Sequence, residues 1–197
     1  MSISINPSVT IAPPSSFLAD TTGYIQGIAL ADPTARQWLL SGAVASTVTQ
    51  PVWGGMGITE NVSVPGSGAA GNRIALATAE TNLTGFTVSN RGYNMIVTPG
   101  NNVQVSTAGM SVPYYRFGSN IRIPVQCSSA LITAVESNPV NTAVEWDYTN
   151  QQLIPHGAGT AIPVKVVAVD SNSKIIAYNS GTGAVTWSTG NVAVIQL

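Results

Sequence analysis

The segment KIIAYNSGTGAVTW, residues 174–187, has the pattern of a β-hairpin. Two runs rich in β-branched and aromatic residues, 174–178 and 184–187, flank the turn-forming residues 179–183. Asn and Gly accept the backbone conformations that a tight turn requires. We therefore expect two paired strands here, and residues 192–195 predict a last strand after them.

The same pattern extends back through the chain to Pro51. Short apolar or alternating runs are bounded by Gly, Pro, Asn and Ser, and they predict strands at residues 86–88, 95–97, 121–125, 144–148 and 164–169. Strands that alternate with helices, as in a parallel sheet, are not apparent. The predicted fold class is therefore all-β, an antiparallel β-sandwich or barrel.

One short helix is predicted, at about residues 33–41. Asp32 is a suitable N-cap, Pro33 suits the first helical position, and Gly42 can end the helix in a left-handed conformation.

The first residues predict an extended arm. Ile3, Ile5, Val9 and Ile11 are spaced among polar residues, while Pro7, Pro13 and Pro14 interrupt any sheet ladder. We expect residues 1–60 to form an N-terminal arm with the short helix, packing on neighbours, and residues 61–197 to form a β-rich body. The alternative for the arm is a frayed terminus.

The charged fraction is 8%, against roughly 25% in a typical soluble protein. The chain is nevertheless 44% hydrophobic, which argues against disorder. No run of about 20 apolar residues predicts a membrane helix. Seven basic and eight acidic side chains without a basic cluster disfavour direct nucleic-acid binding. A surface with so few charges is best explained if partners cover much of it.

The first residues have neither a basic segment nor a continuous apolar run, so we expect assembly in a cytoplasm and not secretion. Cys127 is the only cysteine, which excludes an intrachain disulfide, and its apolar neighbours predict a small buried side chain.

Motifs of catalysis are weak. Residues 66–71 spell a dinucleotide-binding fingerprint, but the strand and helix that it requires are not predicted around it. His156 is the only histidine, and no nucleophile-elbow pattern occurs. We expect no enzyme activity, no cofactor and no metal.

Glu145 and Asp147 are two residues apart, so on a strand both carboxylates share one face. Paired carboxylates occur in glycosidases and calcium sites. The simpler interpretation, which we favour, is a strand with its charged side in water and with Trp146 and Tyr148 in the core.

Several motifs together resemble the structural cement proteins of tailed bacteriophages. The resemblance spans most of the chain and rests on Asn6–Pro7, residues 13–15, 21–33 and 51–55, Gly109–Met110, and residues 115–119, 144–147, 178–183 and 194–197. It implies a jelly-roll-like or related β-barrel body on the outside of the virion's capsid. Such a protein bridges major capsid subunits and stabilises the shell against internal DNA pressure.

The residues that we expect to contact the capsid are in the arm and at one tryptophan: Ile3, Ile5, Val9, Ile11, Pro13, Pro14 and Trp53. For Trp53, an ordinary core position beside a turn is an equal alternative. The expected partners are the major capsid protein and a second copy of the chain, in a dimer at two-fold positions or, as the alternative, a trimer.

Two other functions remain open. A carbohydrate-binding β-sandwich, lectin-like or adhesin, would stack sugars on Trp53, Tyr114 and Tyr115. A small hydrolase would use Glu145 and Asp147.

Overall fold

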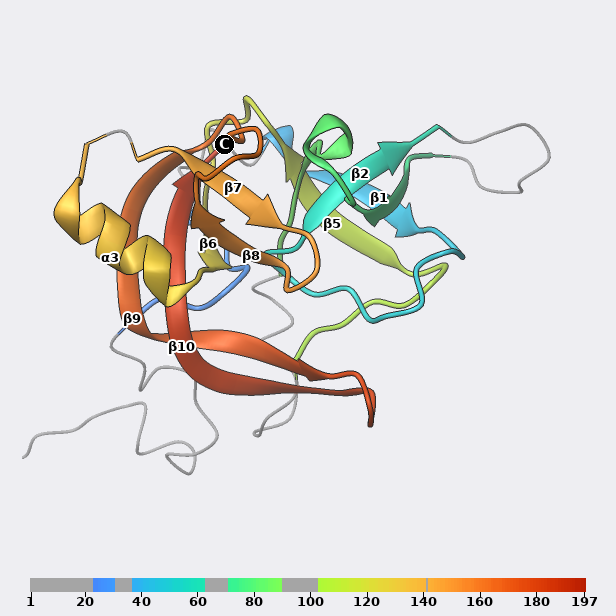
Figure 1. Cartoon of the computed structure of the whole chain (residues 1–197). Coiled ribbons are helices and arrows are strands. Elements are labelled where there is room, and N and C mark those ends of the chain that lie inside the picture. Colours follow the sequence, from blue (N-terminus) through green and yellow to red (C-terminus); the bar gives the residue numbers. More distant parts are fainter. Residues whose placement is uncertain (1–22, 31–36, 63–70, 90–102, 141) are drawn as a thin grey trace, which may run out of the picture.

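The computed structural model describes residues 23–30, 37–62, 71–89, 103–140 and 142–197 (Figure 1). Within these ranges the chain is mostly β-strand, so the all-β prediction is confirmed at that level. None of the helices in these ranges is long and apolar enough to cross a membrane. The first 22 residues, with Ile3, Ile5, Val9, Ile11, Pro13 and Pro14, lie outside the described residues.

Five short strands form a closed barrel in the order β1-β3-β2-β4-β5. They are β1 (Leu40–Val44), β2 (Gly57–Asn61), β3 (Arg73–Leu76), β4 (Gly85–Thr87) and β5 (Ser111–Arg116). A short 3-10 helix, η4 (Glu80–Asn82), lies between β3 and β4.

The barrel is not wholly antiparallel, which corrects the prediction. β1 pairs with β3 in parallel, with Ala43 opposite Arg73, while the other four pairings are antiparallel. Parallel neighbours need a long crossover connection. Residues 45–72, which include β2, supply it.

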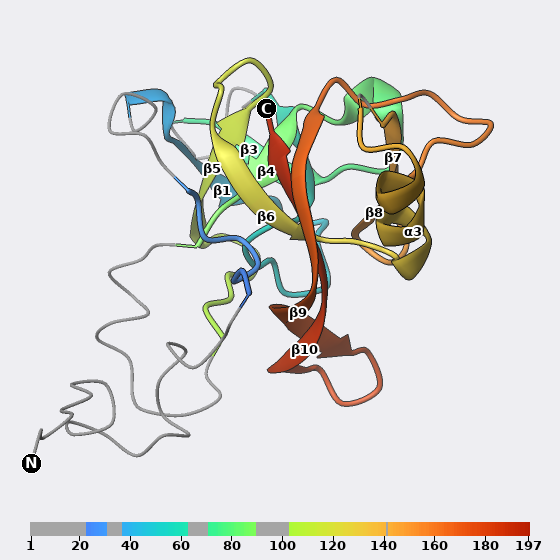
Figure 2. The same cartoon turned by 90° about the vertical axis from the view of Figure 1, so that its left-hand side faces the viewer.

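The second half of the molecule is built on a three-stranded antiparallel sheet in the order β6-β10-β9. Its strands are β6 (Arg122–Gln126), β9 (Lys165–Asn179) and β10 (Ala184–Gln196). A helix, α3 (Ser129–Ser137), contacts β9 and β8 (Gln152–Pro155), and β8 pairs with β7 (Val144–Asp147). Figures 1 and 2 show the far end of the β9–β10 hairpin extending away from α3 and β6.

The predicted hairpin is confirmed, with Val185 opposite Tyr178 and Trp187 opposite Ile176. Residues 192–195 do not form a separate strand. They continue β10, which bends at a register shift between Gly190 and Val192. Four other predicted strands correspond to β4, β6, β7 and the start of β9, and residues 95–97 lie outside the described residues.

The helix predicted at about residues 33–41 is wrong in its described part. Gln37 and Trp38 form a 3-10 turn, and β1 begins at Leu40. Gly42 does not end a helix but lies in β1, where a Cβ atom would be 2.8 Å from Ile74 Cγ2. Pairing with β3 and β5 overrides the local helix signals.

The α-helix found among the described residues, α3, was not predicted. Its N-cap is Ser128, whose side chain accepts a hydrogen bond from Leu131 N, and Leu131 is fully buried. Ile132 and Val135 pack against the same core, which gives the spacing of an amphipathic helix.

Two hydrophobic cores hold the molecule together. The barrel core consists of Val44, Val52, Trp53, Met56, Ile58, Ile74, Val112, Tyr114 and Ile176. The sheet core is larger and includes Phe86, Ile123, Val125, Leu131, Trp146 and Ile195. Cys127 belongs to the sheet core at 3% exposure, as predicted, and burial raises the pKa of its thiol to about 12.

Residues 23–30 pair with two strands of the β6-β10-β9 sheet. Tyr24 O accepts a hydrogen bond from Lys174 N, and Gln26 N donates to Lys174 O. Leu30 N donates to Arg122 O on β6. These residues are therefore integrated into the body, as are β1 and most of β2, although they lie in the 1–60 segment that we assigned to the arm.

Candidate functional site

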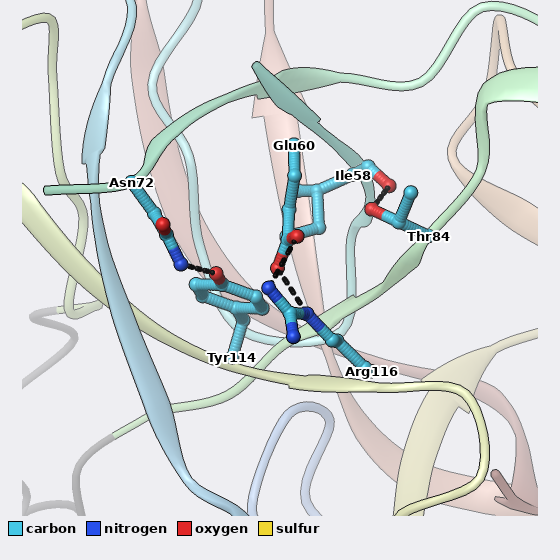
Figure 3. Close-up of polar contacts among 6 residues, drawn as sticks. All are labelled: Ile58, Glu60, Asn72, Thr84, Tyr114 and Arg116. Carbon is cyan, nitrogen blue, oxygen red and sulfur yellow. Dashed lines mark hydrogen bonds and ion pairs between the residues drawn. The ribbon is translucent and has the colours of Figure 1, made fainter. Parts of the chain in front are cut away.

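A polar cluster on the barrel wall consists of Glu60, Arg116, Asn72 and Tyr114 (Figure 3). The Arg116 guanidinium binds the Glu60 carboxylate through two hydrogen bonds of 2.7 Å, from Nε to Oε1 and from Nη2 to Oε2. Beside this pair, Asn72 Nδ2 donates to the Tyr114 hydroxyl at 2.8 Å. Figure 3 shows the Tyr114 ring between Asn72 and the ion pair.

The strand register brings the ion pair together. Arg116 on β5 and Ile58 on β2 both pair with Gly85, the first residue of β4. Before Gly85 the chain leaves the sheet, where Thr84 Oγ1 donates to Ile58 O. Arg116 can therefore reach past β4 to Glu60, two residues further along β2.

The polar groups of this cluster form hydrogen bonds with one another. The Arg116 hydrogen bond holds the pKa of Glu60 below its usual value, although burial opposes the shift. Burial, together with the neighbouring Glu60, raises the pKa of Tyr114. A carboxylate that is already paired with a guanidinium is a poor general base. The cluster therefore has a structural role. The Arg116 side chain, which is 53% exposed, is the part of it that faces solvent.

Glu145 and Asp147 lie on β7 with Trp146 between them, as the alternation predicted. Trp146 is 2% exposed and packs edge-on against Phe86, with ring centroids 4.9 Å apart. The two carboxylates accept hydrogen bonds from different loops, however. Asp147 accepts from Thr149 N, Asn150 N and Asn150 Nδ2, whereas Glu145 accepts from the loop that follows β8.

The hydrogen bonds explain the ionisation of both groups. Gly157 N is the main cause of the lowered pKa of Glu145, with His156 and Gly159 contributing. Burial opposes ionisation of Asp147, but hydrogen bonds from Asn150 and Thr149 outweigh it and lower its pKa. Neither carboxyl has the raised pKa of a general acid. The geometry thus gives no support to a paired-carboxylate hydrolase.

His156 is part of this arrangement, which the sequence did not predict. Its Nδ1 lies 2.7 Å from Glu145 Oε1, and its side chain is 40% exposed. No group of three or more His, Cys, Asp or Glu side chains in the described ranges is placed to hold a metal ion.

Trp53 is buried, with 7% of its surface exposed, and it packs against Tyr178 at a centroid distance of 5.7 Å. Its position matches the core alternative, and its indole ring is not presented on the surface of the single chain. Tyr114 and Tyr115 are 0% and 2% exposed. The sugar-stacking surface expected from these three rings is therefore wrong.

The exposed apolar side chains are different ones. Among the described residues they are Trp38, Leu39, Val62, Met110, Val140 and Val167, and Trp38 is 58% exposed. The sequence offered no signal for their exposure, because apolar side chains of these types suit a core equally well. A second surface feature is readable from sequence alone, since no Asp, Glu, Lys, Arg or His occurs after Lys174.

No family model matches this chain, and neither the curated proteins nor the solved structures contain a match to it.

Proposed function

We propose that this protein is a capsid decoration protein, which binds the outer surface of a tailed-phage head and bridges neighbouring major capsid subunits. The observation that carries the proposal is a chain poor in charge that exposes six large apolar side chains, among the described residues, on a body with two packed cores. Large exposed apolar residues on a protein with so few charges favour coverage by partners.

The body has the stiffness that cementing requires. Its closed barrel pairs the backbone groups of five strands with one another, and the sheet core packs α3 and β7–β8 against the second sheet. Paired backbone and close packing resist deformation. The finer prediction of a jelly-roll-like sandwich stays a prediction.

Attachment would come from apolar side chains. Trp38 and Leu39 offer an aromatic and an aliphatic contact at the start of β1, and aromatic residues are common among interface hot spots. The alternating aliphatic residues of the first 11 positions suit addition to a sheet edge or an apolar groove on a neighbour. Weak contacts multiply on a lattice when copies self-associate, as a dimer or a trimer.

The direct test is co-sedimentation with purified heads that lack this protein. Full-length protein is expected to saturate the heads. A variant lacking residues 2–12 is expected to stay folded, by circular dichroism, and to lose binding. The matched surface control is Thr133→Ala on the exposed side of α3, which should bind as the wild type does.

Failure of the full-length protein to bind heads under any ionic condition would contradict the proposed function. Full occupancy by the shortened variant would contradict the role of the arm and leave the apolar surface of the body as the attachment site.

A further inference from the structure

The loop of residues 156–161 is fixed at both ends and exposed between them. At its start His156 N donates to Ala143 O at 3.1 Å, and just after it Ile162 N donates to Val144 O at 2.9 Å. Ile162 is buried in the sheet core, whereas all residues from 156 to 161 are exposed. The ends are thus set by backbone pairing.

The middle of this loop is organised around one oxygen atom. Glu145 Oε1 accepts from Gly157 N at 2.7 Å and from Gly159 N at 3.0 Å, and His156 Nδ1 lies 2.7 Å away. The Glu145 side chain is only 12% exposed. A carboxylate is the acceptor for this site because it can take several charge-assisted hydrogen bonds at once.

The backbone of the loop is shaped to this carboxylate. A Cβ atom on Gly159 would lie 2.9 Å from Glu145 Oε2 and 3.1 Å from Cδ, so a side chain there would displace the carboxylate. Gly157 has open space at the corresponding position, with no atom within 4 Å. The glycine at 159 is therefore needed for the close approach, and the glycine at 157 is not.

We propose that Glu145 is an acid-sensitive latch for residues 156–161: the ionised carboxylate holds the loop in this conformation, and uptake of a proton from solvent releases it. Protonation turns one acceptor oxygen into an O–H donor and removes the negative charge that faces three N–H groups. The remaining carbonyl oxygen cannot replace the charge-assisted bonds at full strength.

Other titratable groups also lie near Glu145. His156 faces it from the loop itself, and Asp147 on β7 has its carboxylate bonded to residues 149 and 150. The charge of Glu145 is felt by Tyr148, but the pKa of that phenol is raised to about 12, chiefly by burial and then by Glu80 and Glu145. Ile154, the partner of Glu145 on β8, is uncharged.

The pH range follows from the sign of the shift. Because the pKa of Glu145 is lowered from 4.5 in the folded chain, its contribution to holding the loop is complete above that value. The contribution is lost as the pH falls through the lowered pKa. The latch is therefore closed at neutral pH and opens in acid.

The test uses the full chain and follows backbone amides by NMR. As the pH falls from about 5 to 3, the range in which carboxyl groups titrate, the Gly157 and Gly159 amide signals are expected to shift together with a midpoint below 4.5. At pH 7, Glu145→Gln is expected to speed hydrogen exchange at both amides by about tenfold, the loss of roughly one charge-assisted hydrogen bond. Asp147→Asn, two residues along the same strand, is the matched control and should leave both amides unchanged.

A second pair of variants tests the same geometry at constant pH. Gly159→Ala should open the loop at pH 7, whereas Gly157→Ala should not. Exchange in Glu145→Gln that equals the wild type, or loss of the pH transition in Asp147→Asn, overturns the proposal. So does a loop that opens equally in both glycine variants.

Discussion

The barrel and the β6-β10-β9 sheet differ in the length of their strands, in their edges and in their charge. The barrel closes five strands of three to six residues on themselves, which leaves no free edge. The sheet instead contains two strands of 15 and 13 residues, whose far ends leave α3 and β6 and pack against the barrel core. The barrel wall has the Glu60–Arg116 pair, whereas the chain beyond Lys174 has no charge at all. The far end of the hairpin is therefore the region where an added charge tests the proposed capsid contact.

The two halves nevertheless depend on each other, because each supplies side chains to the other's core. Phe86 comes from barrel strand β4 but packs in the sheet core against Trp146. Ile176 comes from β9 but lies in the barrel core, where Tyr178 and Trp187 also pack. The difference in architecture therefore does not make two folding units, and we expect one cooperative transition.

Phe86→Ala tests this dependence and has the largest expected effect. Removing a fully buried ring should lower the free energy of unfolding by about 3–5 kcal/mol while leaving a single transition. Urea unfolding followed by both tryptophan fluorescence and far-UV circular dichroism measures it. Met110→Ala, at a half-exposed position, is the control and should change stability by less than about 0.5 kcal/mol. Two separate transitions would show that the halves fold independently.

Substitution of two glycines compares residues 23–30 with the tip of the β9–β10 hairpin. Gly27 and Gly183 both have positive φ, 75° and 72°. A Cβ on Gly27 would lie 2.4 Å from the Gly54 backbone, whereas Gly183 has no atom within 4 Å. Gly183→Ala should cost about 1–2 kcal/mol for its conformation alone. Gly27→Ala should cost more, since the clash adds to the same strain. Equal losses in thermal unfolding would mean that residues 23–30 are not tightly packed.

Arg116→Ala tests the charged part of the barrel. The pair with Glu60 is bidentate, but the Arg116 side chain is 53% exposed, so its loss should cost about 0.2–1 kcal/mol at pH 7. Because the pKa of Glu60 is lowered, this stabilisation is present above 4.5 and is lost as the pH falls through the lowered value. Wild type and variant should therefore converge in stability in acid. A difference that persists at pH 3 would indicate that packing of the arginine stem, and not its charge, is responsible.

A charge on the hairpin has the smallest expected effect on stability. Thr186 is exposed on β10 opposite Ala177, so Thr186→Lys should change the unfolding free energy by less than about 0.5 kcal/mol. If the uncharged hairpin contacts a neighbour in the capsid, the same variant should bind heads more weakly, because it buries a charge. Unchanged occupancy would remove the hairpin from the proposed contact surface.

The sequence predicted the hairpin because its determinants are local. Turn residues at 179–183 and alternating side chains on either side specify the pairing without help from the rest of the chain. The parallel contact between β1 and β3 has no such local signal, since it depends on where β2 and β5 lie. For the same reason Gly42 resembled a helix end in sequence, yet it packs against Ile74 in a strand. The helix at Ser129–Ser137 does have local signals, which are the N-cap residue Ser128 and the helical spacing of Leu131, Ile132 and Val135.

The candidate sites also contain some features that local sequence predicts and others that depend on distant parts of the chain. A period of two correctly placed Glu145 and Asp147 on one side of β7 and Trp146 on the other. The bond from Glu145 to residues 156–159 was not predictable, because it spans 12 and 14 residues and depends on a loop conformation. Trp53 could not be assigned to surface or core from its neighbours, and the closure of the barrel decides that it is buried.

A cryo-electron map of the virion tests the decoration function most directly. The account predicts copies of this fold on the outside of the head, each touching at least two major capsid subunits, with apolar side chains such as Trp38 or the β9–β10 hairpin in the contacts. A head whose outer surface lacks this fold, while the protein is abundant and unbound in the same infected cells, would contradict it.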